Sequence, residues 1–154
     1  MLSDDVFRSR LETTIASLRY WVPQVADAAR IEDSEIAGAW KLAVTPRTEG
    51  ACAFELLLCE SQKFDLMLAG ETYEDRPIES LSLFLPLVEA ISEGRVIQRR
   101  TSSVLTGILY EVESTVLLGD GALWRDHRCL APISSAVPGD SLTETRHLFL
   151  PYRR

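Results

Sequence analysis

A series of strand-length runs with alternating apolar and polar side chains, separated by short turns, most constrains the fold of this chain. Two runs, 40–45 and 63–68, place an apolar side chain at every second position, and the run between them, 51–59, is apolar except for Glu55. A period of two is typical of half-buried strands, and a continuous apolar run is typical of a central strand. Because the connecting turns are short, we predict an antiparallel three-strand meander over 38–69.

The N-terminal stretch has helical spacing instead. Ser3 offers a capping hydroxyl before two acidic residues, which is a helix start. Apolar residues then recur every three or four positions, at Phe7, Leu11, Ile15, Leu18 and Val22. Pro23 should end or kink this helix near Val22, because proline lacks the amide hydrogen that an internal helical turn needs. With a short helical piece at 24–30, this gives an N-terminal helical region over 1–30.

A second helix is predicted over 77–93, with Gly94 as its C-terminal cap. Its buried face comprises Leu81, Phe84, Leu85, Val88 and Ile91. Pro86 removes a backbone donor from this stretch and leaves two alternatives. Either the helix kinks at Pro86, or it begins near Ser82.

A second strand set follows over 95–128, and its last turn lies at 119–121. A two-residue turn would place Leu117 opposite Trp124 and turn Arg125 and His127 onto the apolar face. A three-residue turn would place Val116 opposite Trp124 and turn the same two polar side chains outward. A slip of one residue exchanges the two faces of a strand, so the apolar pattern favours the three-residue turn.

These elements predict a single α+β domain over 1–154, in the order α-βββ-α-βββ. We expect one antiparallel six-stranded sheet with two main helices on one face, and an irregular C-terminal tail, 129–154, docked on the body. The other face of the sheet would be open, as a surface for dimerisation. A chain of this length buries roughly 70% of its unfolded surface, so it needs no disulfide or metal to fold.

The charge of the chain disfavours anionic partners. The net charge is −7, and it divides into −9 over 1–94 (17 acidic, 8 basic) and +2 over 95–154 (6 acidic, 8 basic). Because an acidic body repels phosphates, we expect neither nucleic acid nor a membrane surface as partner. The first residues lack the pattern of a secretory signal, and three cysteines suit a reducing compartment, so we expect a bacterial cytoplasmic protein.

Motifs that specify a reaction are absent from the sequence. It has no phosphate-binding glycine loop and no Gly-x-Ser-x-Gly elbow. Only two histidines, His127 and His147, are available as metal ligands, with Cys129 close to the first. A structural zinc site normally takes four ligands, so we predict neither a metal nor a cofactor.

The densest polar cluster is 71–76, which we place in a loop before the second helix. Glu71 and Glu74 are candidates for acid and base groups, and the other candidate binding residues there are Tyr73, Asp75 and Arg76.

A second polar cluster, 124–128, contains Arg125 and His127, and His127 can titrate near neutral pH. The second strand set also carries a small basic patch around Arg99 and Arg100. This patch would bind an anion or pair with acidic residues on neighbouring strands. We expect Glu113 to face His127 across the strands.

The order of elements, the small size and the isoelectric point of about 4.9 are similar to those of the specialised chaperones of type III secretion, with no shared motif. This resemblance implies a homodimer. We therefore expect a chaperone-like binding protein that engages a protein partner through an exposed sheet face. The alternative is a metal-independent enzyme for a polar metabolite, with Glu71, Glu74 and His127 as acid/base groups. A cleft joining these residues would favour the enzyme.

Overall fold

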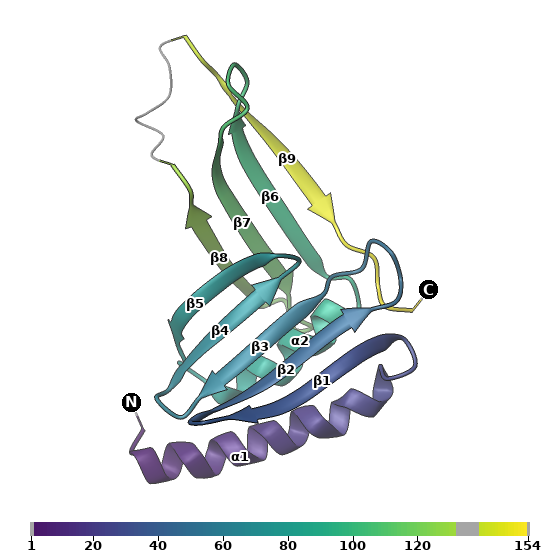
Figure 1. Ribbon diagram of the computed structural model, residues 1–154, viewed down its shortest axis with the longest axis vertical. Helices are drawn as coiled ribbons and strands as arrows, with labels where there is room; N and C mark the ends of the chain where they lie inside the picture. The colour runs from purple at the N-terminus through teal and green to yellow at the C-terminus, as the bar shows by residue number, and fades with distance from the viewer. Residues whose placement is uncertain (1, 132–138, 154) are drawn as a thin grey trace.

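The computed structural model describes residues 2–131 and 139–153 of the chain (Figure 1). Within these ranges the protein has two α-helices, α1 (Asp4–Trp21) and α2 (Phe84–Ser92), and two antiparallel sheets of five and four strands. The prediction of an α+β fold with antiparallel strands is confirmed. The prediction of one six-stranded sheet is wrong, because the two strand sets form separate sheets.

The first sheet is a continuous meander in which each strand pairs with the next along the chain. Its strands are β1 (Ala29–Ile36), β2 (Ala39–Pro46), β3 (Phe54–Cys59), β4 (Lys63–Leu68) and β5 (Glu71–Pro77). The predicted three-strand meander corresponds to β2, β3 and β4. An additional strand extends it on each side: β5 replaces the polar loop that we had expected, and β1 follows the expected helical piece, 24–30, overlapping it only at 29–30.

The two additional strands are polar because their inward residues have polar partners. On β1, Asp33 accepts hydrogen bonds from Trp40 Nε1 (2.7 Å) and from Arg19 Nε on α1 (2.9 Å). Arg19 also lies over the Trp40 ring, 5.7 Å from its centroid. Polar side chains with such hydrogen-bond partners can occupy inward positions of a strand, which are usually apolar. The alternation of apolar and polar residues that predicts a strand is then absent from the sequence.

The second sheet has the order β8-β7-β6-β9. Its strands are β6 (Val96–Ser103), β7 (Leu109–Leu117), β8 (Leu123–Cys129) and β9 (Leu142–Leu148). In β7 and β8, Val116 lies opposite Trp124, and Gly121 has φ +83°, so the three-residue turn is confirmed. Strand β9 lies within the stretch that we had predicted to be irregular. The sequence did not predict this strand because all seven of its residues are exposed, so it has no alternation of apolar and polar side chains.

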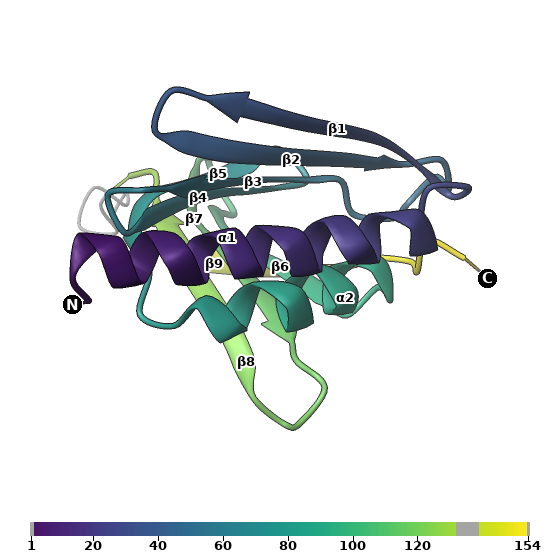
Figure 2. The same ribbon diagram turned by 90° about the horizontal axis from the view of Figure 1, so that it is seen from below.

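Both helices lie side by side along the first sheet, and α2 also contacts β7 of the second sheet (Figure 2). One hydrophobic core joins these elements. In it, Phe64 of β4 meets Phe84 of α2 edge to face at 5.1 Å, and Trp21 of α1 packs on Phe54 of β3 at 6.4 Å. Aromatic pairs at such distances add to the free energy gained from burial.

Helix α2 is shorter than predicted at both ends. A 3-10 turn, Leu81–Leu83, precedes it, and α2 begins at Phe84. Pro86 is therefore its third residue, where an amide hydrogen would have no acceptor inside the helix, and no kink is needed. At the other end Gly94 (φ +79°) donates to Ile91 O (3.1 Å), and Arg95 N donates to Ala90 O (3.0 Å). These are the two hydrogen bonds of a Schellman cap.

The segment 149–153 clasps the first sheet to α2. Leu150 N donates to Gly50 O (2.9 Å), and Tyr152 N donates to Ser92 O (2.8 Å). The Tyr152 hydroxyl, buried in the core, donates to Cys52 O (2.6 Å). This segment, named the clasp below, thus bonds to the β2–β3 loop and to the end of α2.

Candidate functional site: the polar seam between the sheets

The two polar clusters that the sequence separates by about fifty positions meet where β5 lies against β8. Arg76 Nε lies 2.5 Å from Asp126 Oδ2, and a second contact joins the same side chains at 3.3 Å. Glu71 pairs with Arg128 at 3.1 Å. We call this junction of inward polar side chains the seam. It contains Glu71, Tyr73 and Arg76 of β5, and Gln98, Arg100, Ser114, Trp124, Asp126 and Arg128 of the second sheet.

A bulge in β5 sets which of its side chains reach the seam. Tyr73 pairs with Leu66, but Arg76 pairs with Phe64, so β5 has one more residue than β4 in this interval. Asp75 has φ +54°, and its amide donates to the Asp65 carboxylate (2.8 Å). An extra residue shifts the alternation of a strand by one position. Arg76 rather than Asp75 therefore shares the inward face with Glu71 and Tyr73.

Tyr73 anchors a buried hydrogen-bond chain at the centre of the seam. Its hydroxyl lies 2.5 Å from Ser114 Oγ, and Ser114 accepts a further hydrogen bond from Gln98 Nε2 (3.3 Å). Gln98 Nε2 also donates to Leu68 O at 2.9 Å. Burial raises the pKa of the Tyr73 phenol. The three side chains of this hydrogen-bond network are thus uncharged at physiological pH. The network fixes the distance between the two sheets.

Glu71 is shared by two guanidinium groups. Its carboxylate contacts Arg128 at 3.1 Å and Arg100 at 3.5 Å, and only 13% of its side chain is exposed. Two cations and one anion leave this group with a net charge of +1. Arg100 makes the longer contact, and a guanidinium carries five N–H donors.

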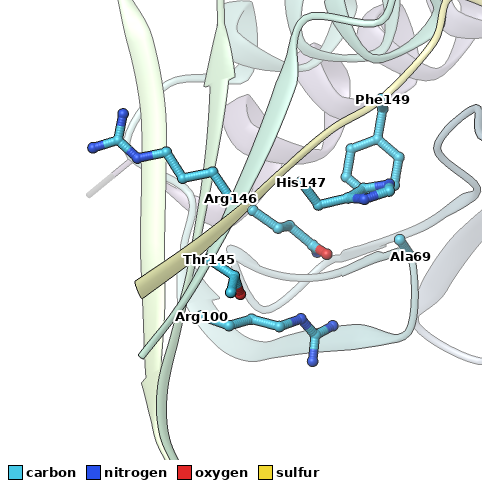
Figure 3. A pocket seen from close by; sticks show the side chains of 7 residues that line it. Ala69, Arg100, Thr145, Arg146, His147 and Phe149 are labelled. Carbon is cyan, nitrogen blue, oxygen red and sulfur yellow. The ribbon is translucent and has the colours of Figure 1, made fainter. Parts of the chain in front are cut away.

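A pocket of about 410 Å³ opens beside Arg100, between β9, β6 and the end of β4 (Figure 3). Its lining includes the side chains of Ala69, Gln98, Arg100, Thr145, His147 and Phe149. In Figure 3, Thr145 and Arg100 approach each other at one side, and the rings of His147 and Phe149 lie together at the other. Arg146 extends to the opposite side of β9.

The remaining predicted site residues lie elsewhere. Arg99, Arg125 and His127 are on the face of the second sheet that points away from the seam, since their inward neighbours alternate with them. Arg99 pairs there with Glu113 (3.2 Å) and Glu144 (2.8 Å), which is the pairing with acids considered for the basic patch.

His127 pairs with Glu113 in the β7–β8 register, as expected. Glu74 is exposed beside the β5 bulge. Glu71 and His127 thus face opposite sides of the second sheet, so Glu71 shares no cleft with His127.

The cysteines differ in exposure. Burial raises the pKa of the Cys52 thiol to about 12, and burial also raises that of Cys59. Cys129 is exposed at the end of β8. Over 2–131 and 139–153, no three or more His, Cys, Asp or Glu side chains come together in a way that could hold a metal ion.

Several seam residues were not predicted as site residues, although the sequence carries a signal for two of them. Ser114 and Gln98 occupy inward positions on β7 and β6, where their neighbours Val112, Val116 and Val96 are apolar and buried. A polar residue at an inward position requires a hydrogen-bond partner, and this marks it for attention. For the pocket residues Thr145 and His147, β9 has no apolar alternation that would mark an inward position, and His147 stood out only as one of two histidines.

Comparison of the chain with models of protein families, with curated proteins and with solved structures found no match. In the part of the chain that the structure describes, no helix has both the length and the apolar character needed to cross a membrane.

Proposed function

We propose that this chain is a protein-interaction module, which pairs with a second copy of itself through β9 and engages a protein partner through the outward face of the second sheet. The observation that carries the proposal is the state of β9. Among the strands that the structure describes, it is the last of its sheet and pairs only with β6, and all seven of its residues are exposed. An open strand edge is a template for pairing with another chain.

The backbone of β9 permits antiparallel self-pairing centred on Thr145. Val104 N donates to Ser141 O, and Phe149 N donates to Val96 O, so the odd-numbered residues of this strand direct their backbone groups toward β6. Because the direction alternates, the even-numbered residues 142–148 direct theirs to the open edge. Pairing about Thr145 matches even-numbered residues with even-numbered ones, and each such pair exchanges two hydrogen bonds.

The side chains of β9 complement each other in the same register. Glu144 of one copy lies opposite Arg146 of the other, and Leu142 lies opposite Leu148. Directly opposed unlike charges and apolar pairs each contribute about 0.2–1 kcal/mol to an antiparallel ladder. A two-fold axis repeats both pairs, as an isologous contact requires. The result would be one continuous sheet that contains the second sheets of both copies.

The partner surface of this proposal is the outward face of the second sheet, on which Leu148, Leu123 and Leu117 are exposed by 68%, 47% and 43%. Leu117 lies opposite Leu123, and Leu148 lies opposite Ile97, which makes two apolar cross-strand pairs. Arg125 lies at the β8 end of the row that holds Leu148 and Ile97, Arg99 lies in the next row, and both contact Glu113. An apolar patch ringed by charges is typical of a protein-binding surface, so the occupant is a protein with an exposed apolar segment.

The mass of the protein in solution tests the self-pairing. Light scattering after size exclusion should give twice the 17.2 kDa mass of the chain at micromolar concentration. Arg146→Glu would oppose like charges twice and should give a monomer, and the double variant Glu144→Arg/Arg146→Glu should restore the dimer. Arg30→Glu, a reversal on the exposed edge of the first sheet, is the matched control. A wild-type monomer, or an Arg146→Glu dimer, would overturn the pairing.

The partner surface has a separate test. The double variant Leu117→Ser/Leu123→Ser alters the outward face but leaves β9 intact. In affinity capture, the wild-type protein should recover one partner protein that the double variant does not. That protein should bind the wild type with saturation when purified, and should bind the double variant at least about tenfold more weakly. Equal binding to both forms contradicts the assignment of this face.

A further inference from the structure

We infer that the pocket beside β9 binds an oxyanion, a carboxylate or a phosphoryl group, carried on a small, flat, apolar body. This site lies on the seam side of the second sheet, opposite the proposed partner surface, and its Thr145 and His147 come from the strand proposed for self-pairing. Its volume of about 410 Å³ is within the range of small-molecule sites.

The charge of the pocket is positive. Arg100 lines it, and among the residues that the structure describes no carboxylate side chain does. Glu71, which contacts Arg100 at 3.5 Å, is shared with Arg128, whose contact is shorter by 0.4 Å. With its single long contact to Glu71, the Arg100 guanidinium keeps donors that an incoming oxyanion can use. A planar guanidinium suits a carboxylate or phosphoryl group because it can donate two parallel hydrogen bonds.

The wall of the pocket is preorganised. Gln98 is only 2% exposed, and its amide nitrogen is already committed to Leu68 O and Ser114 Oγ. Ser114 is held in turn by Tyr73. A side chain fixed in this way keeps its position when a ligand arrives, so little conformational freedom is lost on binding.

The other side of the pocket is apolar and flat. The His147 ring meets the Phe149 ring edge to face, with 4.4 Å between their centroids, and Ala69 adds a methyl group opposite β9. Figure 3 shows these rings on one side and the Arg100 guanidinium and the Thr145 side chain on the other. An anion joined to an aromatic or similarly flat body would contact both sides at once.

Three probes separate charge from shape: benzoate, phenyl phosphate and the neutral benzamide, each titrated into the full chain by calorimetry and by ligand-observed NMR. We expect saturable binding of benzoate, phenyl phosphate or both, weakened by added salt, and no binding of benzamide. The relative affinity of the two anions distinguishes a carboxylate ligand from a phosphoryl ligand. Failure of both anions to bind, or equal binding of benzamide, overturns the proposal.

Two substitutions should change the affinity in opposite directions. Arg100→Gln should weaken anion binding at least about tenfold, the loss expected for a charged hydrogen-bond partner. Glu71→Gln should strengthen it, because it removes the acid that competes for Arg100. Arg125→Gln, on the other face of the same sheet, is the charge-matched control and should bind as the wild type does.

Thermal melts establish that each variant is folded, and Thr145→Val replaces Arg100→Gln if the latter fails to fold, with weaker binding again expected. An affinity that stays unchanged in Arg100→Gln, or in its replacement, contradicts the assignment.

Discussion

The hydroxyl oxygens of Tyr73 on β5 and Ser114 on β7 lie 2.5 Å apart, although 41 positions separate the two residues in the chain. Both side chains are buried, so this hydrogen bond connects the two sheets in an interior without solvent. A hydrogen bond in such a place fixes register and distance more than it adds net stability, since water would otherwise satisfy both groups.

Tyr73→Phe should lower the free energy of unfolding by about 1 kcal/mol, because it removes one hydrogen bond and leaves Ser114 with Gln98 as its remaining partner. Urea denaturation measures the change. Tyr20→Phe is the matched control and should be neutral, since Tyr20 is 81% exposed. A double-mutant cycle with Ser114→Ala should show coupling between the two positions. Additive effects would mean that the hydroxyl contact does not join the sheets.

Gly94→Ala should be more damaging than Gly107→Ala or Gly119→Ala. A Cβ at Gly94, where φ is +79°, would lie 2.6 Å from Pro151 N and 2.8 Å from Leu150 C, both of them backbone atoms of the clasp region. Backbone strain alone costs about 1–3 kcal/mol, and the clash adds to it. Chemical denaturation should rank Gly94→Ala below Gly107→Ala, which has φ +73° in open space, and Gly119→Ala should be nearly neutral. Equal losses at positions 94 and 107 would contradict the close approach.

Asp33 should contribute to the acid stability of the fold. The hydrogen bond from Arg19, with another from Trp40, holds the pKa of this carboxyl below its usual value of 3.8. The stabilisation is therefore complete above about pH 4 and is lost as the pH falls through the lowered pKa in the folded state. Asp33→Asn should be less stable than the wild type at pH 7, and the difference should shrink below pH 3.8. Urea midpoints across this range test it, with the exposed Glu12→Gln as control; a constant difference would exclude the linkage.

The three thiols should react with an alkylating reagent at very different rates in the native protein. Cys129 is exposed, whereas burial keeps Cys52 protonated, with a pKa of about 12. The thiolate is the reactive form, so Cys52 should be labelled only when the protein opens. Mass spectrometry during iodoacetamide labelling should find Cys129 modified first, and Cys129→Ser should lack this fast step. Early modification of Cys52 would contradict its burial in the folded protein.

Alternation predicted the strands whose inward residues are apolar, and it failed where those residues are polar. The β2–β4 meander and the β7–β8 register follow from the spacing of residues such as Trp40, Phe64 and Val116, because a shift by one residue would expose them. Strands β1 and β5 were not predicted, since Asp33 and Arg76 are stabilised by partners on other elements. Local sequence contains no information about those partners.

The seam was only half predictable for the same reason. The polar clusters 71–76 and 124–128 stand out in the sequence, but Arg76 and Asp126 are 50 positions apart, and their contact depends on how two sheets dock. The β5 bulge then decides that Arg76, and not Asp75, reaches Asp126. A single sheet, as predicted, has no junction between two sheets. The predicted fold therefore gave no reason to expect contact between Glu71 and Arg128.

The clasp has a consequence for the order in which the fold forms. Thr48 donates to Tyr152 O across 104 positions of the chain, whereas neighbouring strands of the first sheet pair through short turns. Contacts between distant positions require a large loop to close before they yield any stabilisation, so they form late. Folding should thus end when 149–153 docks. Hydrogen exchange at Tyr152, whose amide bonds to Ser92, would then report the same opening event as exchange at the end of α2.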